Sequence, residues 1–294
     1  MSYNTNNVWI VSAYGFIDYT RTRFLNSQLS PTYKILAEGD SWFHIGGHTG
    51  VGNVRNLIDG MSFGDHHTLV CNMALSGDTM SNMSSNISSP EFFKFLKTYQ
   101  WDGLVLSAGG NDLIDALIAE SGYKYRNTTL SIIQPCVSPS SYMDHINQQH
   151  LSLFCIAVTE HYQRFIDYKN NTVNKYKPVF IHVYDYPTPR NAPAKLFEYF
   201  KKGPWVYKAL SKMQVDLRFW QQISDYIFDQ LAITILQFDG QNHISVINTR
   251  NTLIRANAGD TGNSNDWLNE IHPNKDGIAK LCKKINAKLN NIYI

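Results

Sequence analysis

The chain has 294 residues, 43% of them hydrophobic and 13% aromatic, so it can bury a sizeable core in one large α/β domain or two small ones. Its 26 Lys and Arg residues nearly balance its 24 Asp and Glu residues, and a net charge of +2 excludes a steering field for nucleic acid or an anionic membrane. The four cysteines form no CxxC pair, which excludes the common zinc and redox motifs.

Short segments rich in aliphatic and β-branched residues alternate with longer helical patterns. The predicted strands are 33–39, 68–74, 102–108, 178–185 and 243–249. The predicted helices are 90–99, 111–120, 149–169, 205–235 and 274–290. This alternation favours a parallel sheet covered on both faces. We therefore predict one domain over residues 1–294, with a three-layer α/β/α architecture and a five-stranded, mostly parallel sheet.

Two segments fit this alternation poorly. Residues 121–148 and 186–204 carry much of the proline and several aromatic residues, and we predict insertions there. Long irregular excursions in a compact domain usually form lids or binding walls, with surface decoration as the alternative. Their aromatic residues could line an acyl or sugar pocket, although such residues more often pack beneath a loop: Tyr123, Tyr125, Tyr186, Phe197, Tyr199, Phe200 and Trp205.

The residues that follow the predicted strands are polar or small. In an open parallel sheet, ligands bind beyond the carboxyl ends of the strands, so these residues are the informative ones. The first strand ends in a Gly-Asp-Ser-Trp turn with Ser41, the second leads to Gly77, and the third leads to Asn111. Near the C-terminus, His272 precedes a proline and a predicted helix. These residues are therefore candidates for one shared site.

This set resembles the SGNH, or GDSL-type, hydrolase superfamily, whose landmarks are a serine, a glycine, an asparagine and a histidine in that chain order. Ser41, Gly77, Asn111 and His272 match these landmarks, and Asp40 matches the family's turn. The resemblance covers the first three predicted strands of the sheet and the last thirty or so residues. It implies a flavodoxin-like SGNH-hydrolase fold and a serine esterase that requires no cofactor and no metal.

The chemistry of these residues agrees with the resemblance. A serine hydroxyl is a weak nucleophile near neutral pH, and His272 is the candidate base for Ser41. The backbone N–H groups of Ser41 and Gly77 and the side-chain amide of Asn111 would donate to the oxyanion. Taken singly, each motif also has a structural interpretation as a turn, a helix cap or an ordinary loop. Further residues near the strand ends are candidates for substrate contacts: Asp40, Trp42, His44 and Gly110.

The partner of His272 is left open by the sequence. The family usually has an aspartate three residues before its histidine, whereas this chain has Asn269. An asparagine oxygen can accept the histidine N–H and fix its tautomer, but it supplies no charge to stabilise the imidazolium. Asp266, six residues before the histidine, or a backbone carbonyl could serve instead. Asn269 and Asp266 are therefore both candidate catalytic residues.

We expect an esterase that acts on an acyl lipid, a lysophospholipid, an acetylated sugar or a thioester. The alternatives are a binding protein on a hydrolase scaffold, with its catalysis weakened, and an amidase or peptidase that uses the same serine. His44 and His48 have i, i+4 spacing, but the glycines between them disfavour a helical zinc site.

Partners and location follow from what the sequence lacks. No apolar run approaches the roughly 18 residues that span a bilayer, and the first residues lack the features of a secretory signal. We expect no integral membrane segment, no nucleic-acid partner, and a protein that is cytoplasmic or exported without a visible signal peptide. The sequence favours neither a monomer nor an oligomer.

Overall fold

The structure is a computed structural model that describes residues 2–3, 7–22, 30–44, 56–197 and 200–293. Within these ranges, seven strands form one sheet in the order β1-β2-β4-β3-β5-β8-β11. The strands are β1 (Ser2–Tyr3), β2 (Val8–Val11), β3 (Tyr33–Gly39), β4 (Thr68–Asn72), β5 (Gly103–Ser107), β8 (Val179–Val183) and β11 (Ile244–Asn248). All neighbouring strands run parallel except β1, which is antiparallel to β2 at the edge.

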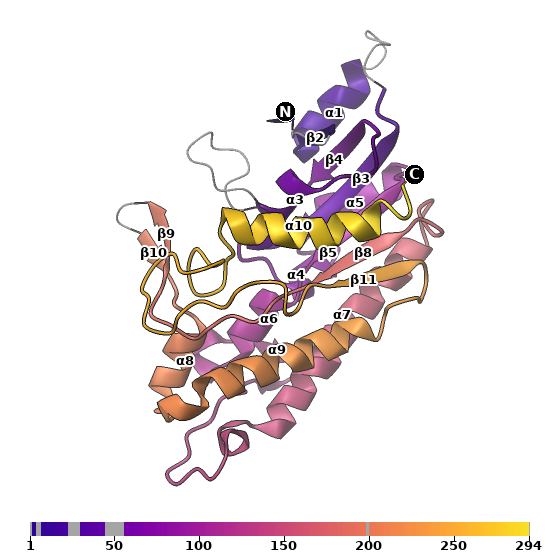
Figure 1. Ribbon diagram of the computed structural model, residues 1–294. Helices are drawn as coiled ribbons and strands as arrows, with labels where there is room; N and C mark the ends of the chain where they lie inside the picture. Colours follow the sequence, from indigo (N-terminus) through magenta and orange to yellow (C-terminus); the bar gives the residue numbers. More distant parts are fainter. Residues whose placement is uncertain (1, 4–6, 23–29, 45–55, 198–199, 294) are drawn as a thin grey trace.

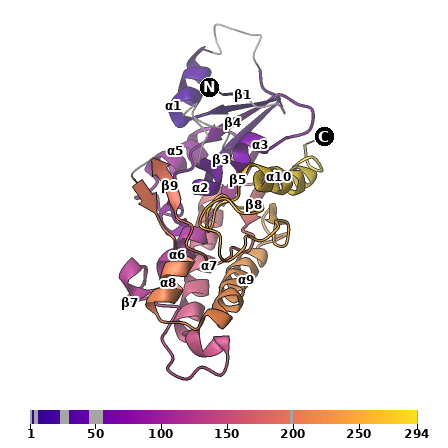
Figure 2. The ribbon, with the colours of Figure 1, turned by 60° about the vertical axis from the view of Figure 1, so that its left-hand side comes forward.

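Helices cover both faces of this sheet, which confirms the predicted three-layer α/β/α architecture. They are α1 (Ala13–Thr22), α2 (Ser41–His44), α3 (Leu57–Gly60), α4 (Met80–Met83), α5 (Pro90–Thr98), α6 (Gly110–Ala116), α7 (Gln148–Asn170), α8 (Val206–Lys212), α9 (Trp220–Leu236) and α10 (Lys275–Leu289). Figures 1 and 2 show α3 and α10 on one face, with α1, α5, α7 and α9 on the other. No helix in the described ranges is long and apolar enough to cross a membrane.

The five predicted strands are confirmed, each to within two residues at either end. β5 and β8 are buried at every position, as expected for aliphatic runs in a sheet covered on both faces. The prediction of five strands missed β1 and β2. β2 has only four residues, too few to show a periodic pattern, and its place in the sheet comes from pairing with β4.

The predicted helix over 205–235 is wrong, because this stretch forms two helices. α8 ends at Lys212, and Gln214 takes a positive φ of 51°, which a continuing helix cannot accommodate. Asp216 then accepts a hydrogen bond from the N–H of Arg218 and begins a 3₁₀ turn (Leu217–Phe219) that leads into α9. The other predicted helices are confirmed, although α6 ends four residues earlier than expected.

Both predicted insertions contain a short hairpin. The first holds β6 (Lys124–Tyr125) and β7 (Thr128–Thr129), and the second holds β9 (Ala194–Phe197) and β10 (Phe200–Lys202). Two more 3₁₀ turns, Ala119–Ser121 and Tyr142–His145, lie at or within the first insertion.

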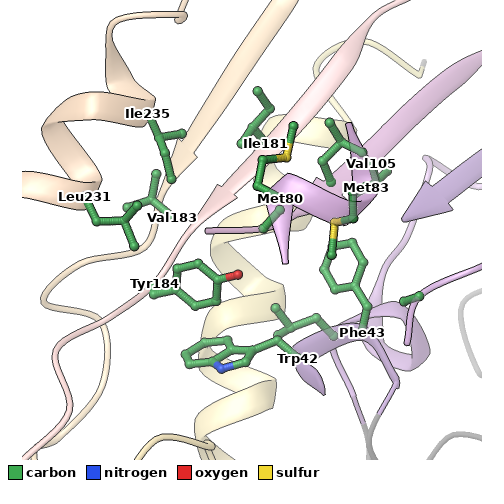
Figure 3. Close-up of a cluster of buried hydrophobic side chains, with 14 of the residues drawn as sticks. Trp42, Phe43, Met80, Met83, Val105, Ile181, Val183, Tyr184, Leu231 and Ile235 are labelled. Atoms are coloured by element: carbon green, nitrogen blue, oxygen red, sulfur yellow. The ribbon is translucent and has the colours of Figure 1, made fainter. Parts of the chain in front are cut away.

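Among the described residues, buried hydrophobic side chains from Val8 to Tyr293 form one cluster. Figure 3 shows the part of this cluster beside the carboxyl ends of the strands, where Trp42, Phe43 and Tyr184 pack near Met80 and Met83.

The register of the central strands gathers the predicted site residues at one edge. Ala37 of β3 pairs with Asn72 of β4, and Gly39 of β3 pairs with Ser107 of β5. The three strands therefore end at the same level, and the segments that follow them must meet there. The loop after β4 continues along β3, because the N–H of Leu75 donates to the carbonyl of Gly39 at 2.9 Å.

Candidate active site

Ser41 is the first residue of α2 and directly follows the turn at the end of β3. Asp40 builds this turn: one carboxylate oxygen accepts the N–H of Trp42 at 2.9 Å, and the other accepts the hydroxyl of Tyr184 at 2.6 Å. Burial raises the pKa of Asp40 to about 7. The position before it must be glycine, because a Cβ on Gly39 would lie 2.9 Å from the Phe43 ring and 3.0 Å from a backbone oxygen. The turn therefore fixes Ser41 at the edge of the sheet.

His272 contacts Ser41 directly. Its Nε2 lies 2.7 Å from the Ser41 Oγ, and its Nδ1 lies 2.9 Å from the Asn269 Oδ1. The same Asn269 oxygen accepts the N–H groups of Ile271 and His272 at 3.1 and 3.0 Å. Because this atom accepts backbone N–H groups, it must be the amide oxygen, and Nδ1 must donate to it. Nε2 is then free to accept the proton of Ser41.

The surroundings of His272 hold it neutral. Burial, and secondly the charge of Lys202, lower the pKa of this histidine to about 3. The imidazole is therefore uncharged at neutral pH, in the form that a general base needs.

The acidic candidate near His272 is engaged elsewhere. Asp266 accepts the N–H of Ile254 at 2.6 Å and forms a salt bridge with Lys280, and it makes no hydrogen bond to His272 in the described part of the chain. Of the alternatives that the sequence left open, the structure brings Asn269 to the imidazole and leaves Asp266 in a structural bridge between the C-terminal loop and α10.

Glu270 is a buried carboxylate whose role the sequence reasoning missed. It accepts the N–H groups of Arg190, Trp205, Val206 and Tyr207, although burial outweighs these bonds and raises its pKa to about 7. It thereby ties the start of α8 to the loop that carries His272. The partners lie more than sixty residues away in the chain, so no local signal could have identified them.

Gly77 and Asn111 lie on two neighbouring segments beyond the strand ends. Gly77 has a φ of 87°, the left-handed region that favours glycine. The Asn111 amide donates to the carbonyl of Asp78 at 2.8 Å, which leaves its second amide hydrogen available. Asp112 accepts the N–H groups of Met80 and Ser81 at 2.6 and 3.2 Å, and burial raises its pKa to about 6. These bonds join the segment of Gly77 to the start of α6.

Two cavities lie at or near the residues predicted for the site. The first, about 20 Å³, is lined by Ser41 and Asn111 and by three of the predicted substrate residues, Asp40, Trp42 and Gly110. Of these, Trp42 is mostly packed inside the fold against His182, Tyr184 and Trp267.

The second cavity, about 520 Å³, is not lined by Ser41. Its lining includes His44, Glu38 and Asp78. The predicted substrate contact at His44 therefore lies apart from the first cavity, and its Nδ1 is 3.0 Å from the Ser76 hydroxyl.

The second insertion contributes to the site more than the first. Trp205 packs edge-on against the imidazole of His272, with ring centroids 5.6 Å apart, and Lys202 lies beside Gly77. The hydroxyls of Tyr123 and Tyr125 in the first insertion, and of Tyr186 in the second, donate to carboxylates of the fold. The side chains of Phe197, Tyr199 and Phe200 lie outside the part of the chain that the structure describes. The sequence reasoning missed Lys202, because nothing nearby in the sequence points to Gly77.

The described residues contain no group of three His, Cys, Asp or Glu side chains that could hold a metal ion. His48 and the glycine-rich stretch 46–53 lie outside those residues.

No family model and no curated protein matches the sequence. Among solved structures, the lipase Lip_vut3 from a goat rumen metagenome is similar, with 13% identity and a TM-score of 0.53 over 87% of this chain and 97% of that one. A possible lipase from Chitinophaga pinensis (13% identity, TM-score 0.48, 88% and 98% of the chains) and an extracellular lipase from Streptomyces rimosus (11%, 0.47, 87% and 99%) are also similar. The likeness to Lip_vut3 extends over most of both chains, and this chain therefore shares the fold of that structure.

Proposed function

We propose that the chain is a serine esterase that hydrolyses a carboxylic ester through an acyl-serine intermediate. The observation that carries this proposal is the chain of contacts from Asn269 through His272 to Ser41, with distances of 2.9 and 2.7 Å. A nucleophile, a base and a group that orients the base are what acyl transfer requires of side chains. The fold shared with the lipase Lip_vut3 and the match to the SGNH landmarks support the same activity.

In the proposed reaction, His272 Nε2 takes the proton of Ser41 while the serine oxygen attacks the ester carbonyl. The N–H groups of Ser41 and Gly77 and the free amide hydrogen of Asn111 donate to the resulting oxyanion. The intermediate then collapses, and the leaving alcohol receives the proton from His272. Water attacks the acyl-serine with His272 again as base, which releases the acid and restores the enzyme.

The size of the first cavity supports a short acyl group. Its volume of about 20 Å³ has room for little more than one water molecule, and Ile114 and Phe228 close it on the apolar side. A short acyl group such as acetyl would require the least widening of this cavity, whereas a palmitoyl chain would need another path. Among the substrate classes expected from the sequence, this favours acetylated compounds over long-chain lipids.

The test is a panel of 4-nitrophenyl esters from acetyl to palmitoyl, assayed with the wild type and with Ser41→Ala. We expect turnover of the shortest esters, its loss in Ser41→Ala, and labelling of Ser41 by a serine-directed phosphonate. Full turnover in Ser41→Ala, or labelling of another serine, would refute the assignment.

A binding protein on the same scaffold is the second candidate. The observation that favours it is the neutral amide at the imidazole, because Asn269 cannot stabilise the imidazolium by charge. Such a protein would bind the short esters without turning any of them over, so the same panel separates the two candidates.

A further inference from the structure

The ammonium of Lys202 lies close to Gly77, one of the residues of the proposed oxyanion site. Lys202 is the last residue of β10, and a Cβ built on Gly77 would be 3.1 Å from its Nζ. Because a Cα–Cβ bond is about 1.5 Å long, the Nζ lies within about 5 Å of the Gly77 Cα. A positive charge therefore lies next to the backbone N–H that is proposed to meet the oxyanion.

This charge has no close counter-ion in the described part of the chain. Lys202 is exposed and makes no salt bridge within 4 Å there. Asp115 of α6 is a carboxylate that its charge affects, but burial raises the pKa of Asp115 despite the opposing effect of Lys202, and the two side chains are beyond ion-pair distance. His272 is also affected, but it is neutral at neutral pH, because burial and secondly Lys202 lower its pKa. An unpaired ammonium beside a nucleophile can bind an anion of the substrate.

The backbone near Lys202 is anchored. Three residues further on, the N–H of Trp205 donates to the buried Glu270, together with those of Val206 and Tyr207. The Trp205 ring in turn packs on His272. Gly203, between them, allows this approach, because a Cβ there would lie 2.5 Å from the Trp205 ring. These contacts keep the base of the Lys202 side chain beside the site.

We propose that Lys202 makes the enzyme selective for esters that carry a carboxylate or a phosphate near the scissile carbonyl. This inference rests on the proposed function. Because the Nζ lies within about 5 Å of the Gly77 Cα, the ammonium can bind an anionic group of the same substrate whose carbonyl oxygen meets the Gly77 N–H. The anion can belong to the acyl part, as in a succinyl ester, or to the alcohol part, as in a glycerol phosphate ester.

The experiment uses matched neutral and anionic esters. For the acyl part, 4-nitrophenyl butyrate is compared with mono-4-nitrophenyl succinate. For the alcohol part, 1-butyrylglycerol is compared with 1-butyrylglycerol 3-phosphate. We expect the wild type to prefer the anionic member of one pair, and Lys202→Met to lower the anionic-to-neutral ratio of kcat/KM for that pair about tenfold or more, mainly through KM.

Two further variants sharpen the result. Lys202→Arg should retain most of the preference, because it keeps the charge, and Lys283→Met, which removes an exposed lysine on α10, should leave the ratio unchanged. No preference in the wild type for either pair would overturn the proposal. An equal fall in kcat for neutral and anionic esters in Lys202→Met would also overturn it, because Lys202 would then act on the oxyanion itself.

A binding measurement separates this proposal from the esterase proposal. Calorimetry with Ser41→Ala compares 1-butyrylglycerol 3-phosphate and mono-4-nitrophenyl succinate with their neutral partners, and addition of Lys202→Met should weaken the anionic ligand of the preferred pair about tenfold. If the wild type turns over no ester but this difference appears, the esterase proposal fails and the anion site stands. If neutral esters are hydrolysed and no such difference appears, only the anion site fails.

Discussion

The turns after β3 and β5 and the loop before α10 use their acidic side chains in the same way. Asp40 holds the turn that carries Ser41, and Asp112 holds the segment after Gly77. In the C-terminal loop, Asp266 bonds the N–H of Ile254 and Glu270 bonds the start of α8. In all four cases the carboxylate accepts backbone N–H groups.

The two regions differ in what contacts the reacting groups. At the strand ends, the proposed oxyanion donors are backbone N–H groups and the Asn111 amide, whereas in the C-terminal loop a neutral asparagine contacts the imidazole. The carboxylate closest in sequence to the base, Glu270, points to α8 instead. We therefore infer a strong oxyanion site at the strand ends and, in the C-terminal loop, a base that lacks a counter-charge.

The largest effect is expected from His272. His272→Gln removes the acceptor for the Ser41 proton, and kcat/KM should fall by about 10⁴-fold or more. The matched control is His66→Gln, because His66 precedes β4 and therefore lies at the amino ends of the strands, away from the site. Steady-state kinetics with a short ester measures both variants. A loss below tenfold would mean that another group activates Ser41.

Asn111→Ala tests the proposed oxyanion site at the strand ends. Asn111→Ala removes one proposed oxyanion donor, and kcat should fall by about 10²–10³-fold with a smaller change in KM. The variant also loses the bond to the Asp78 carbonyl, so thermal unfolding must be measured beside the kinetics. A change confined to KM would assign Asn111 to substrate binding.

The sequence predicts local features of the fold and the site, but not the contacts between distant segments. The strands and the four landmark residues are local patterns in the sequence, and Ser41 and His272 do meet, at 2.7 Å. The partner of His272 was undecidable, because the contacts that occupy Asp266 come from Ile254 and Lys280, at other places in the chain.

The misses have the same origin. The break between α8 and α9 depends on the backbone conformation of Gln214, and the helical periodicity continues across it. The position of Lys202 beside Gly77 depends on where the second insertion packs in the folded chain. Such contacts between distant segments leave no trace in periodicity or spacing.

Asn269→Asp tests whether the base in the C-terminal loop lacks a counter-charge. Asn269→Asp places a carboxylate on the imidazole, which favours the protonated histidine, so its pKa should rise from about 3 and the lower limb of the pH profile should move upward. In the wild type, activity should persist to acidic pH, because His272 stays neutral above its low pKa. At neutral pH the variant should gain about tenfold in kcat/KM per pKa unit of imidazolium stabilisation. An unchanged profile would mean that the Asn269 oxygen is not the operative partner.

Asp266 should matter least for catalysis and more for stability. Asp266→Ala leaves the partly buried N–H of Ile254 without its acceptor, which costs about 1 kcal/mol, while the partly exposed Lys280 returns to water at little cost. The melting temperature should therefore fall, and kcat/KM of the folded fraction should change by less than about threefold, since Asp266 makes no bond to His272. Lys280→Met is the matched control, because it removes the salt bridge but keeps the acceptor for Ile254, and it should lower the melting temperature less. If Asp266→Ala instead lost orders of magnitude in kcat with an unchanged melting temperature, Asp266 would be acting on the imidazole, and the division between structural carboxylates and a neutral partner for the base would be wrong.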